Sequence, residues 1–283
     1  LSNSSIKSIP EESVEYKTLL EVQNRLFKEY EENNEIFDAS DVKKIIKSLR
    51  YLRRFAQRQD GNVNKTFEMV KNTLIWRKAM KIPLMTDDLI PLEFYDLGIA
   101  FINGTDRDGN FIFNVRAKYA YFNENVNTAL ERMCIFMLFK VIEASITAGT
   151  GWTLLLDITG ISVTQWDFSE LVWLLKVVIN YMPAGLKSAI LYNMPWFAKP
   201  FAKILMPFIP REWKHIIHIV GPKELPKLVP EEFIPCYMEN PKNKFVIPTP
   251  SDAKSMSEID TTILDTDKHL LLKFCQQVLA RVK

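Results

Sequence analysis

Apolar residues in the first part of the chain recur every three or four positions, which is the pattern of amphipathic helices. This spacing predicts a helix over about 14–30. The residues Asp38-Ala-Ser-Asp41 can cap a second helix, over about 41–57, which Gly61-Asn62 should end. A third helix is expected over about 64–80. The beginning of the chain is therefore predicted to be entirely helical.

After Gly98 the apolar residues form short continuous runs, which are typical of buried β-strands. Strands are predicted over 99–103, 111–115, 153–158, 188–193 and 215–220, and helices over about 127–148 and 167–181. Alternating strands and helices imply parallel strands with right-handed crossovers. We therefore expect an α/β protein, with a helical N-lobe followed by a lobe built on a mostly parallel sheet with flanking helices.

The stretch from Pro195 to Pro210 is unusually apolar and is bounded by prolines. We call it the proline-bounded segment and expect it to form a short helix. Its sequence offers two interpretations: it fills a core, or it covers a cavity. In the second case the protein would carry a hydrophobic ligand.

Composition narrows the possible functions. Nearly half of the 283 residues are apolar and the net charge is +2, which argues against a dominant nucleic-acid-binding field. The three cysteines are far apart and predict neither a disulfide framework nor a zinc site. Apolar runs are interrupted well before the ~20 residues of a transmembrane helix, and no signal peptide is recognisable.

Catalytic motifs are absent from the sequence. It contains no G-x-S-x-G, no phosphate-binding G-x-x-x-x-G-K-[ST] and no H-E-x-x-H. Asp106 to Asn110 suggests a hairpin turn rather than a calcium loop, because the final Glu is missing. His215 and His218 would point to opposite faces of one strand, which argues against a shared metal site. Asp157 ends a buried strand and either serves as a catalytic base or, as we favour, hydrogen-bonds the following turn at Thr159-Gly160.

Two groups of motifs together resemble one family. They are Leu49–Arg58 with Val63–Val70 and Leu74–Arg77, followed by Leu154–Ile161, Tyr181-Met-Pro, Tyr192–Trp196, Met206–Pro210 and Ile219–Gly221. This ordered series, spread over about residues 40–240, resembles the CRAL-TRIO (Sec14-like) lipid-transfer domains. The likeness implies an N-lobe of about 1–95, a lipid-binding lobe of about 96–245 and a C-terminal extension of 246–283.

The resemblance also implies an apolar lipid pocket beneath a mobile gate helix, which would be the proline-bounded segment. Strand alternation and the family pattern predict the residues in contact with ligand. They are Trp152, Leu154, Leu156, Leu174, Val178, Met182, Ala189 and Leu191 in the pocket, and Trp196, Phe197, Phe201, Ile204, Leu205 and Phe208 on the gate. For each of them a place in a solid core is the competing interpretation.

The sequence departs from the phosphoinositide-binding members of that family. Ala184 and Ile216 stand where those members carry a Glu and a Lys. A less polar ligand is therefore expected, such as a fatty acid, a sterol-like molecule, a retinoid or another phospholipid. No cofactor and no metal are expected.

Between residues 42 and 58 the chain contains seven basic residues and no acidic one. Lys43, Lys44, Lys47, Arg50, Arg53, Arg54 and Arg58 form either a solvated helix face or a surface that docks on anionic membranes. Arg53 and Arg54 could alternatively pair with carboxylates between the lobes.

The sequence thus predicts a non-catalytic lipid carrier, located in the cytoplasm and in transient contact with membranes. The rival hypothesis is a scaffold with a collapsed lobe that binds proteins. The predicted helix over 263–281 offers a surface for a protein partner or a second copy.

Overall fold

The computed structural model describes residues 13–118, 126–161, 168–198, 200, 204, 206–238 and 248–282. The chain divides into two compact units. The first comprises the residues up to Pro83 with Ile146–Gly149 and Trp173–Gly185, and the second comprises the remainder. The domain bounds expected from the sequence stay a prediction.

Helices account for most of the first unit, as the sequence predicted. They are α1 (Val14–Glu32), α2 (Ala39–Asp41), a π-helix (Val42–Ile46), α3 (Leu49–Arg58) and α4 (Val63–Ala79). Helix α1 packs against α3 and α4 and buries Leu19, Val22 and Leu26 completely. The apolar stripe read from the sequence is therefore the core of this unit.

The helix expected over 41–57 is interrupted in the structure. The backbone of Ser48 is extended, and its hydroxyl accepts a hydrogen bond from the Tyr51 amide at 3.3 Å, so that α3 begins anew at Leu49. Serine side chains hydrogen-bond the backbone in this way and favour the N-cap position, directly before a helix. The basic run is consequently divided between two helical pieces.

A buried ion pair joins the second and fourth helices. Arg77 donates from Nε to Asp41 Oδ2 at 2.6 Å and from a terminal nitrogen to Oδ1 at 2.8 Å, and both side chains are at most 3% exposed. Nearby, Lys78 donates to the backbone carbonyl of Phe37 at 2.9 Å. These contacts fix the loop between α1 and α2 against the end of α4.

The last part of helix α7 (Phe168–Tyr181) and the residues after it, together Trp173–Gly185, belong to the first unit and contact its other helices. The Tyr181 ring stacks on Trp76, with ring centroids 4.5 Å apart and planes 2° apart. The Thr73 hydroxyl donates to the Tyr181 carbonyl at 3.1 Å, and the Ala184 amide donates to the Arg54 carbonyl at 3.0 Å. Trp76 and Tyr181, which belong to separate sequence motifs, thus form one contact.

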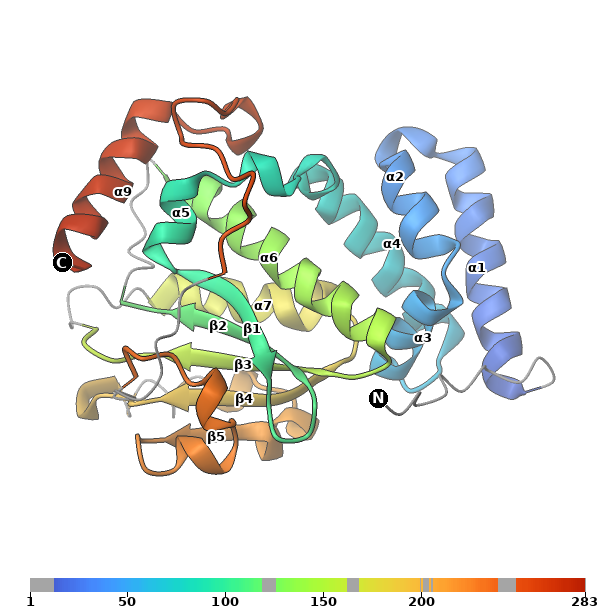
Figure 1. Cartoon of the computed structure of the whole chain (residues 1–283). Helices are drawn as coiled ribbons and strands as arrows, with labels where there is room; N and C mark the ends of the chain where they lie inside the picture. The colour runs from blue at the N-terminus through green and yellow to red at the C-terminus, as the bar shows by residue number, and fades with distance from the viewer. Residues whose placement is uncertain are drawn as a thin grey trace. The chain divides into compact units, whose positions relative to one another are not determined.

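The second unit contains a five-stranded sheet in the order β1-β2-β3-β4-β5 (Figure 1). Its strands are β1 (Ala100–Thr105), β2 (Phe111–Arg116), β3 (Trp152–Asp157), β4 (Leu186–Tyr192) and β5 (Ile217–Val220). Only β1 is antiparallel to its neighbour. The mostly parallel sheet is as predicted, but β5 begins at Ile217, and His215 lies in a 3₁₀ helix (Arg211–Ile216) instead of a strand.

The predicted hairpin connects β1 and β2, and its loop is fixed by Asp106. The Asp106 carboxylate accepts the Asn110 amide at 2.9 Å and the Thr153 hydroxyl at 2.5 Å. The Asn110 side chain in turn accepts the Gly151 amide at 3.0 Å. The acidic loop therefore secures the hairpin to the start of β3.

The C-terminal residues pack within the second unit. Helix α6 (Asn127–Ala148) contributes Arg132, which donates to the Ile263 carbonyl at 2.6 Å and pairs with Asp265 at 2.7 Å. Helix α9 (Lys268–Val282) lies against α5 (Leu92–Leu97) and buries the apolar side chains that face it, Leu271, Phe274, Cys275 and Val278 (Figure 1).

Removing one partner of the buried ion pair should destabilise the protein strongly. Asp41→Ala would leave the Arg77 guanidinium charged and buried without its carboxylate, at an expected cost of about 3–5 kcal/mol in the free energy of unfolding. Glu15→Ala breaks the more exposed pair with Arg53 and should cost less than about 1 kcal/mol. Urea denaturation measures both values, and similar losses for the two variants would contradict this assignment.

Candidate functional site: an apolar sheet face and the segment after β4

Two adjacent rows of apolar side chains cross one face of the sheet. The strand register aligns Phe113, Leu154, Ala189 and Ile217 in the first row, and Val115, Leu156, Leu191 and Ile219 in the second. We call these eight residues the apolar face. Most of them are only half-buried, and the exposed fraction reaches 56% at Ile219.

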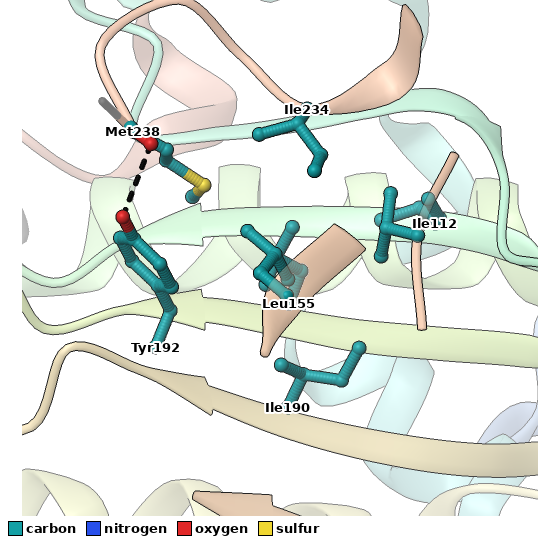
Figure 2. Close-up of a cluster of buried hydrophobic side chains, with 8 residues drawn as sticks. Ile112, Leu155, Ile190, Tyr192, Ile234 and Met238 are labelled. Carbon is teal, nitrogen blue, oxygen red and sulfur yellow. Dashed lines mark hydrogen bonds between the residues drawn. The ribbon is translucent and has the colours of Figure 1, made fainter. Parts of the chain in front are cut away.

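The opposite face of the sheet is filled. Ile112, Leu155 and Ile190 are completely buried there, beneath the residues that follow β5 (Figure 2). The Tyr192 hydroxyl donates to the Met238 carbonyl at 3.1 Å and closes one end of this cluster. The apolar face is therefore the candidate surface for binding a ligand.

Strand alternation explains the difference between the two faces. Successive side chains of a strand point to opposite sides, so Leu154 and Leu156 share one face whereas Leu155 lies on the other. Parallel sheets are normally covered on both faces. Since residues 221–238 cover the filled face, the right-handed crossover from β4 to β5 is expected over the apolar face.

That crossover contains the proline-bounded segment, which exposes large apolar side chains. Trp196 is 81% exposed, Phe208 57% and Ile204 52%. In the described part of the chain seven large apolar side chains are exposed, and five of these lie between 196 and 219. Exposed apolar groups concentrated in one segment indicate a surface that contacts a partner, a ligand or a membrane.

The described ends of this segment are 3₁₀ turns, Trp196–Ala198 and Met206–Phe208, and between them Pro200 and Ile204 are α-helical, in agreement with the predicted short helix. Phe197 is half-buried and meets Trp196 edge to face, with centroids 6.1 Å apart. Phe201 and Leu205, which were expected on the gate, lie outside the described residues.

The remaining predicted pocket residues occupy different environments. Trp152 is 2% exposed and precedes Leu154 by two positions on β3. Leu174, Val178 and Met182 fall in the first unit, where Met182 is buried and the other two are half-buried. Contact of these four side chains with a ligand stays a prediction.

Sequence reasoning missed half of the apolar face. Phe113 and Val115 come from the predicted hairpin, and Ile217 and Ile219 from the last strand. The alternation of side chains between the two faces along those strands could have identified these four residues. The alignment of the rows, however, depends on strand register, which the sequence did not specify.

Asp157 hydrogen-bonds the turn that follows β3, as we favoured. Its Oδ1 accepts the Thr159 amide at 2.9 Å. Burial raises the pKa of the Asp157 carboxyl, although hydrogen bonds from Thr159 and the charges of Arg116 and Lys118 oppose that rise. Because this carboxyl is 6% exposed and lies on the side of Leu155, it has little access to a ligand on the apolar face.

The basic run does not form one free surface. Lys43, Lys47 and Arg50 are exposed, whereas Arg53 donates to both carboxylate oxygens of Glu15, at 2.6 and 3.0 Å. Burial and the neighbouring Arg53 lower the pKa of Arg54. The partner of Arg53 comes from α1 of the same unit and not from the second lobe.

Asp157 gives a pH prediction. A raised pKa in the folded state means that the native protein binds more protons than the unfolded chain, so Asp157 reduces stability as pH rises above its ordinary value of about 3.8. Asp157→Asn keeps an acceptor for Thr159 and removes the charge. The variant should therefore be more stable than wild type at pH 7.

Chemical denaturation at pH 4, 5, 6 and 7 tests this sign. The advantage of Asp157→Asn should shrink as pH falls. An advantage that is independent of pH, or a variant that is less stable at pH 7, would contradict the assigned direction.

Neither a membrane-spanning helix nor a metal-binding group of side chains is found in the described parts of the chain. None of those helices is both long and apolar enough to cross a membrane. Among the same residues, no three His, Cys, Asp or Glu side chains gather in a way that could hold a metal ion.

Comparisons with known proteins agree with the fold. Two Arabidopsis thaliana proteins are similar in sequence: Patellin-4 is 28% identical over 200 residues, or 65% of this chain, and Patellin-2 is 25% identical over 167 residues, or 54% of this chain. These alignments span 36% and 24% of the two relatives. The crystal structure of Sfh5 superposes with a TM-score of 0.55 over 93% of this chain and 98% of its own, at 13% identity.

A family model, the CRAL/TRIO domain, matches residues 95–239, about half of the chain. This range includes all five strands and the proline-bounded segment. The chain therefore belongs to the CRAL/TRIO domain family, which is known for lipid binding and transfer.

Proposed function

We propose that this protein binds one lipid or another hydrophobic molecule against the apolar face and exchanges it with membranes. The observation that carries the proposal is the contrast between the two sheet faces. One is filled with completely buried side chains, whereas the other is apolar and only half-buried. Family membership supports the same function.

The proline-bounded segment is the proposed gate. Its exposed Trp196, Ile204 and Phe208 are suited to enter the interfacial region of a bilayer when the segment opens. Burying a side chain of this size contributes roughly 1.5–3 kcal/mol. Two or three of them suffice for transient membrane contact, which is consistent with a cytoplasmic protein that visits membranes.

The proposed ligand is less polar than a phosphoinositide. Ala184 and Ile216 offer no charge where the phosphoinositide-binding members have a Glu and a Lys. The backbone amide of Ala184 is also engaged, because it donates to the Arg54 carbonyl. Mass spectrometry of lipids that co-purify with the native protein would identify the ligand class.

We do not extend the proposal to a protein partner on α9. In this helix Leu271, Phe274, Cys275 and Val278 are buried within the second unit, Leu272 and Leu279 are half-buried, and Leu270 is exposed. A partner there stays a prediction. A closer relationship to the CRAL-TRIO part of motile-sperm-domain-containing protein 2, suggested by Phe37–Val42, the turn from Gly104 to Asn110 and Asn193–Trp196, also stays a prediction.

Charged residues in place of exposed apolar side chains of the gate should weaken membrane binding and lipid uptake. Trp196→Asp combined with Phe208→Asp removes two exposed apolar groups and is expected to lower binding to phosphatidylcholine vesicles, and lipid uptake from them, at least ~10-fold. Leu84→Asp combined with Leu270→Asp is the matched control, because these side chains are also exposed and the charge change is identical. Equal behaviour of the two double variants in vesicle flotation would refute the gate.

A bulky residue on the apolar face distinguishes a carrier from a filled scaffold. Ala189→Trp should occupy ligand space, so that the amount of bound lipid falls at least by half while the free energy of unfolding changes by less than about 1 kcal/mol. In a filled lobe the same change would overpack the core and cost about 1–3 kcal/mol.

The neighbouring Ile190→Phe provides the control for this experiment. Ile190 is completely buried on the filled face, so enlarging it should cost about 1–3 kcal/mol and leave lipid binding unchanged. If Ala189→Trp behaved like Ile190→Phe, the scaffold hypothesis would replace the carrier.

A further inference from the structure

A lysine lies on the side of the apolar face, at the amino end of β4. Lys187 precedes Ala189 and Leu191 by two and four positions, so strand alternation places these three side chains on one side of the sheet. Lys187 is exposed, and no ion pair or hydrogen bond joins it to another residue in the described part of the chain. The other charged residues of the strands, Arg116 and Asp157, lie on the side of Leu155.

Strands β3 and β4 pair with a shift in register at this lysine. Trp152 lies opposite Leu186, and Thr153 lies opposite Ser188, which leaves Lys187 as an extra residue on β4. Irregularities of this kind change the direction of a side chain and are frequent next to functional sites. The lysine is therefore placed by a local departure from the regular pairing of the two strands.

Trp152 brings a hydrogen-bond donor to the same end of the sheet. It precedes Leu154 by two positions on β3, which places its ring on the side of the apolar face. Trp152 is 2% exposed, and its indole Nε1 has no hydrogen-bond acceptor among the described residues. A buried donor without an acceptor is unfavourable, so an acceptor atom on a ligand would stabilise this site.

The smallest side chain of the apolar face follows Lys187 on the same strand. Ala189 stands between Leu154 and Ile217 in the first row and is half-buried. From Lys187 to Leu191 the strand extends over roughly 13 Å. An alkyl chain whose polar end is at Lys187 can therefore run along β4 over Ala189 and contact both apolar rows.

We propose that the ligand is a long-chain fatty acid, whose carboxylate pairs with Lys187 and accepts the indole N–H of Trp152. The assignment rests on the proposed function and gives the chemical class of its ligand. A carboxylate brings one negative charge to one cation, and hydrogen bonds between charged partners are stronger than neutral ones. The alkyl chain needs no polar partner, which agrees with the eight apolar side chains beyond it.

Equilibrium binding of palmitate and of hexadecanol to the delipidated protein tests this assignment, because the two molecules have equal chain lengths and differ in charge. Lys187→Met should weaken palmitate binding at least ~10-fold and leave hexadecanol binding unchanged. Lys187→Arg keeps the charge and should retain the palmitate affinity within about 3-fold.

Lys223→Met is the matched control for the lysine. Lys223 is also exposed in the second unit, but it belongs to the residues that cover the filled face. This variant should bind both molecules like wild type. If Lys187→Met weakened palmitate and hexadecanol equally, or weakened neither, the fatty-acid assignment would be overturned.

Trp152→Phe removes the indole donor and keeps an aromatic ring. The hydroxyl of hexadecanol and the carboxylate of palmitate can both accept the indole N–H, so this variant should weaken both ligands, roughly 3- to 10-fold. Urea denaturation checks that the variant is folded. Unchanged binding of both ligands to the folded variant would remove Trp152 from the proposed site.

The two proposals fail in different ways. If wild-type protein bound neither palmitate nor hexadecanol nor phosphatidylcholine, the proposed function itself would fall. If it bound phosphatidylcholine or hexadecanol but not palmitate, or bound palmitate independently of Lys187, only the fatty-acid assignment would fall.

Discussion

A parallel sheet must be covered on both faces, because its strands are apolar on both sides. In this protein the two faces meet that requirement differently. Residues 221–238 cover one face with tightly buried side chains around Leu155 and Ile190, and the hydroxyl of Tyr192 completes the cluster. The other face presents apolar rows that are only half-buried. The proposed ligand site on the apolar face follows from this difference in burial between the two faces.

The proline-bounded segment differs from an ordinary crossover helix in the side chains that it exposes. A regular crossover helix would bury its apolar residues against the sheet, whereas this segment leaves Trp196 and Phe208 exposed. Its described ends are 3₁₀ turns, closed by backbone hydrogen bonds from Ala198 to Pro195 and from Ile209 to Met206. Where β4 ends and the segment begins, hydrogen bonds run from Asp157 through Thr159 to Asn193.

The first unit depends on polar contacts of another kind. Its helices bury an apolar stripe. Two further contacts join them, the ion pair of Asp41 with Arg77 and the stacking of Trp76 on Tyr181. Trp76 and Arg77 are adjacent in sequence, but Trp76 contacts Tyr181 at the end of α7, whereas Arg77 contacts Asp41 at the end of α2. A dipeptide that looks like a family signature is thus explained by two separate contacts.

The sequence by itself determined the element order, the hairpin, the parallel strands and the turn role of Asp157, because these follow from local periodicity and from short-range hydrogen bonds. It also indicated Leu154, Leu156, Ala189 and Leu191 through strand alternation. It failed at Ser48, where a side chain starts a new helix, and at His215, which precedes the strand. Only the tertiary structure aligned the two apolar rows, because register depends on pairing between strands distant in sequence. It alone joined Asn193 to Thr159, since no local pattern records a bond across 34 residues.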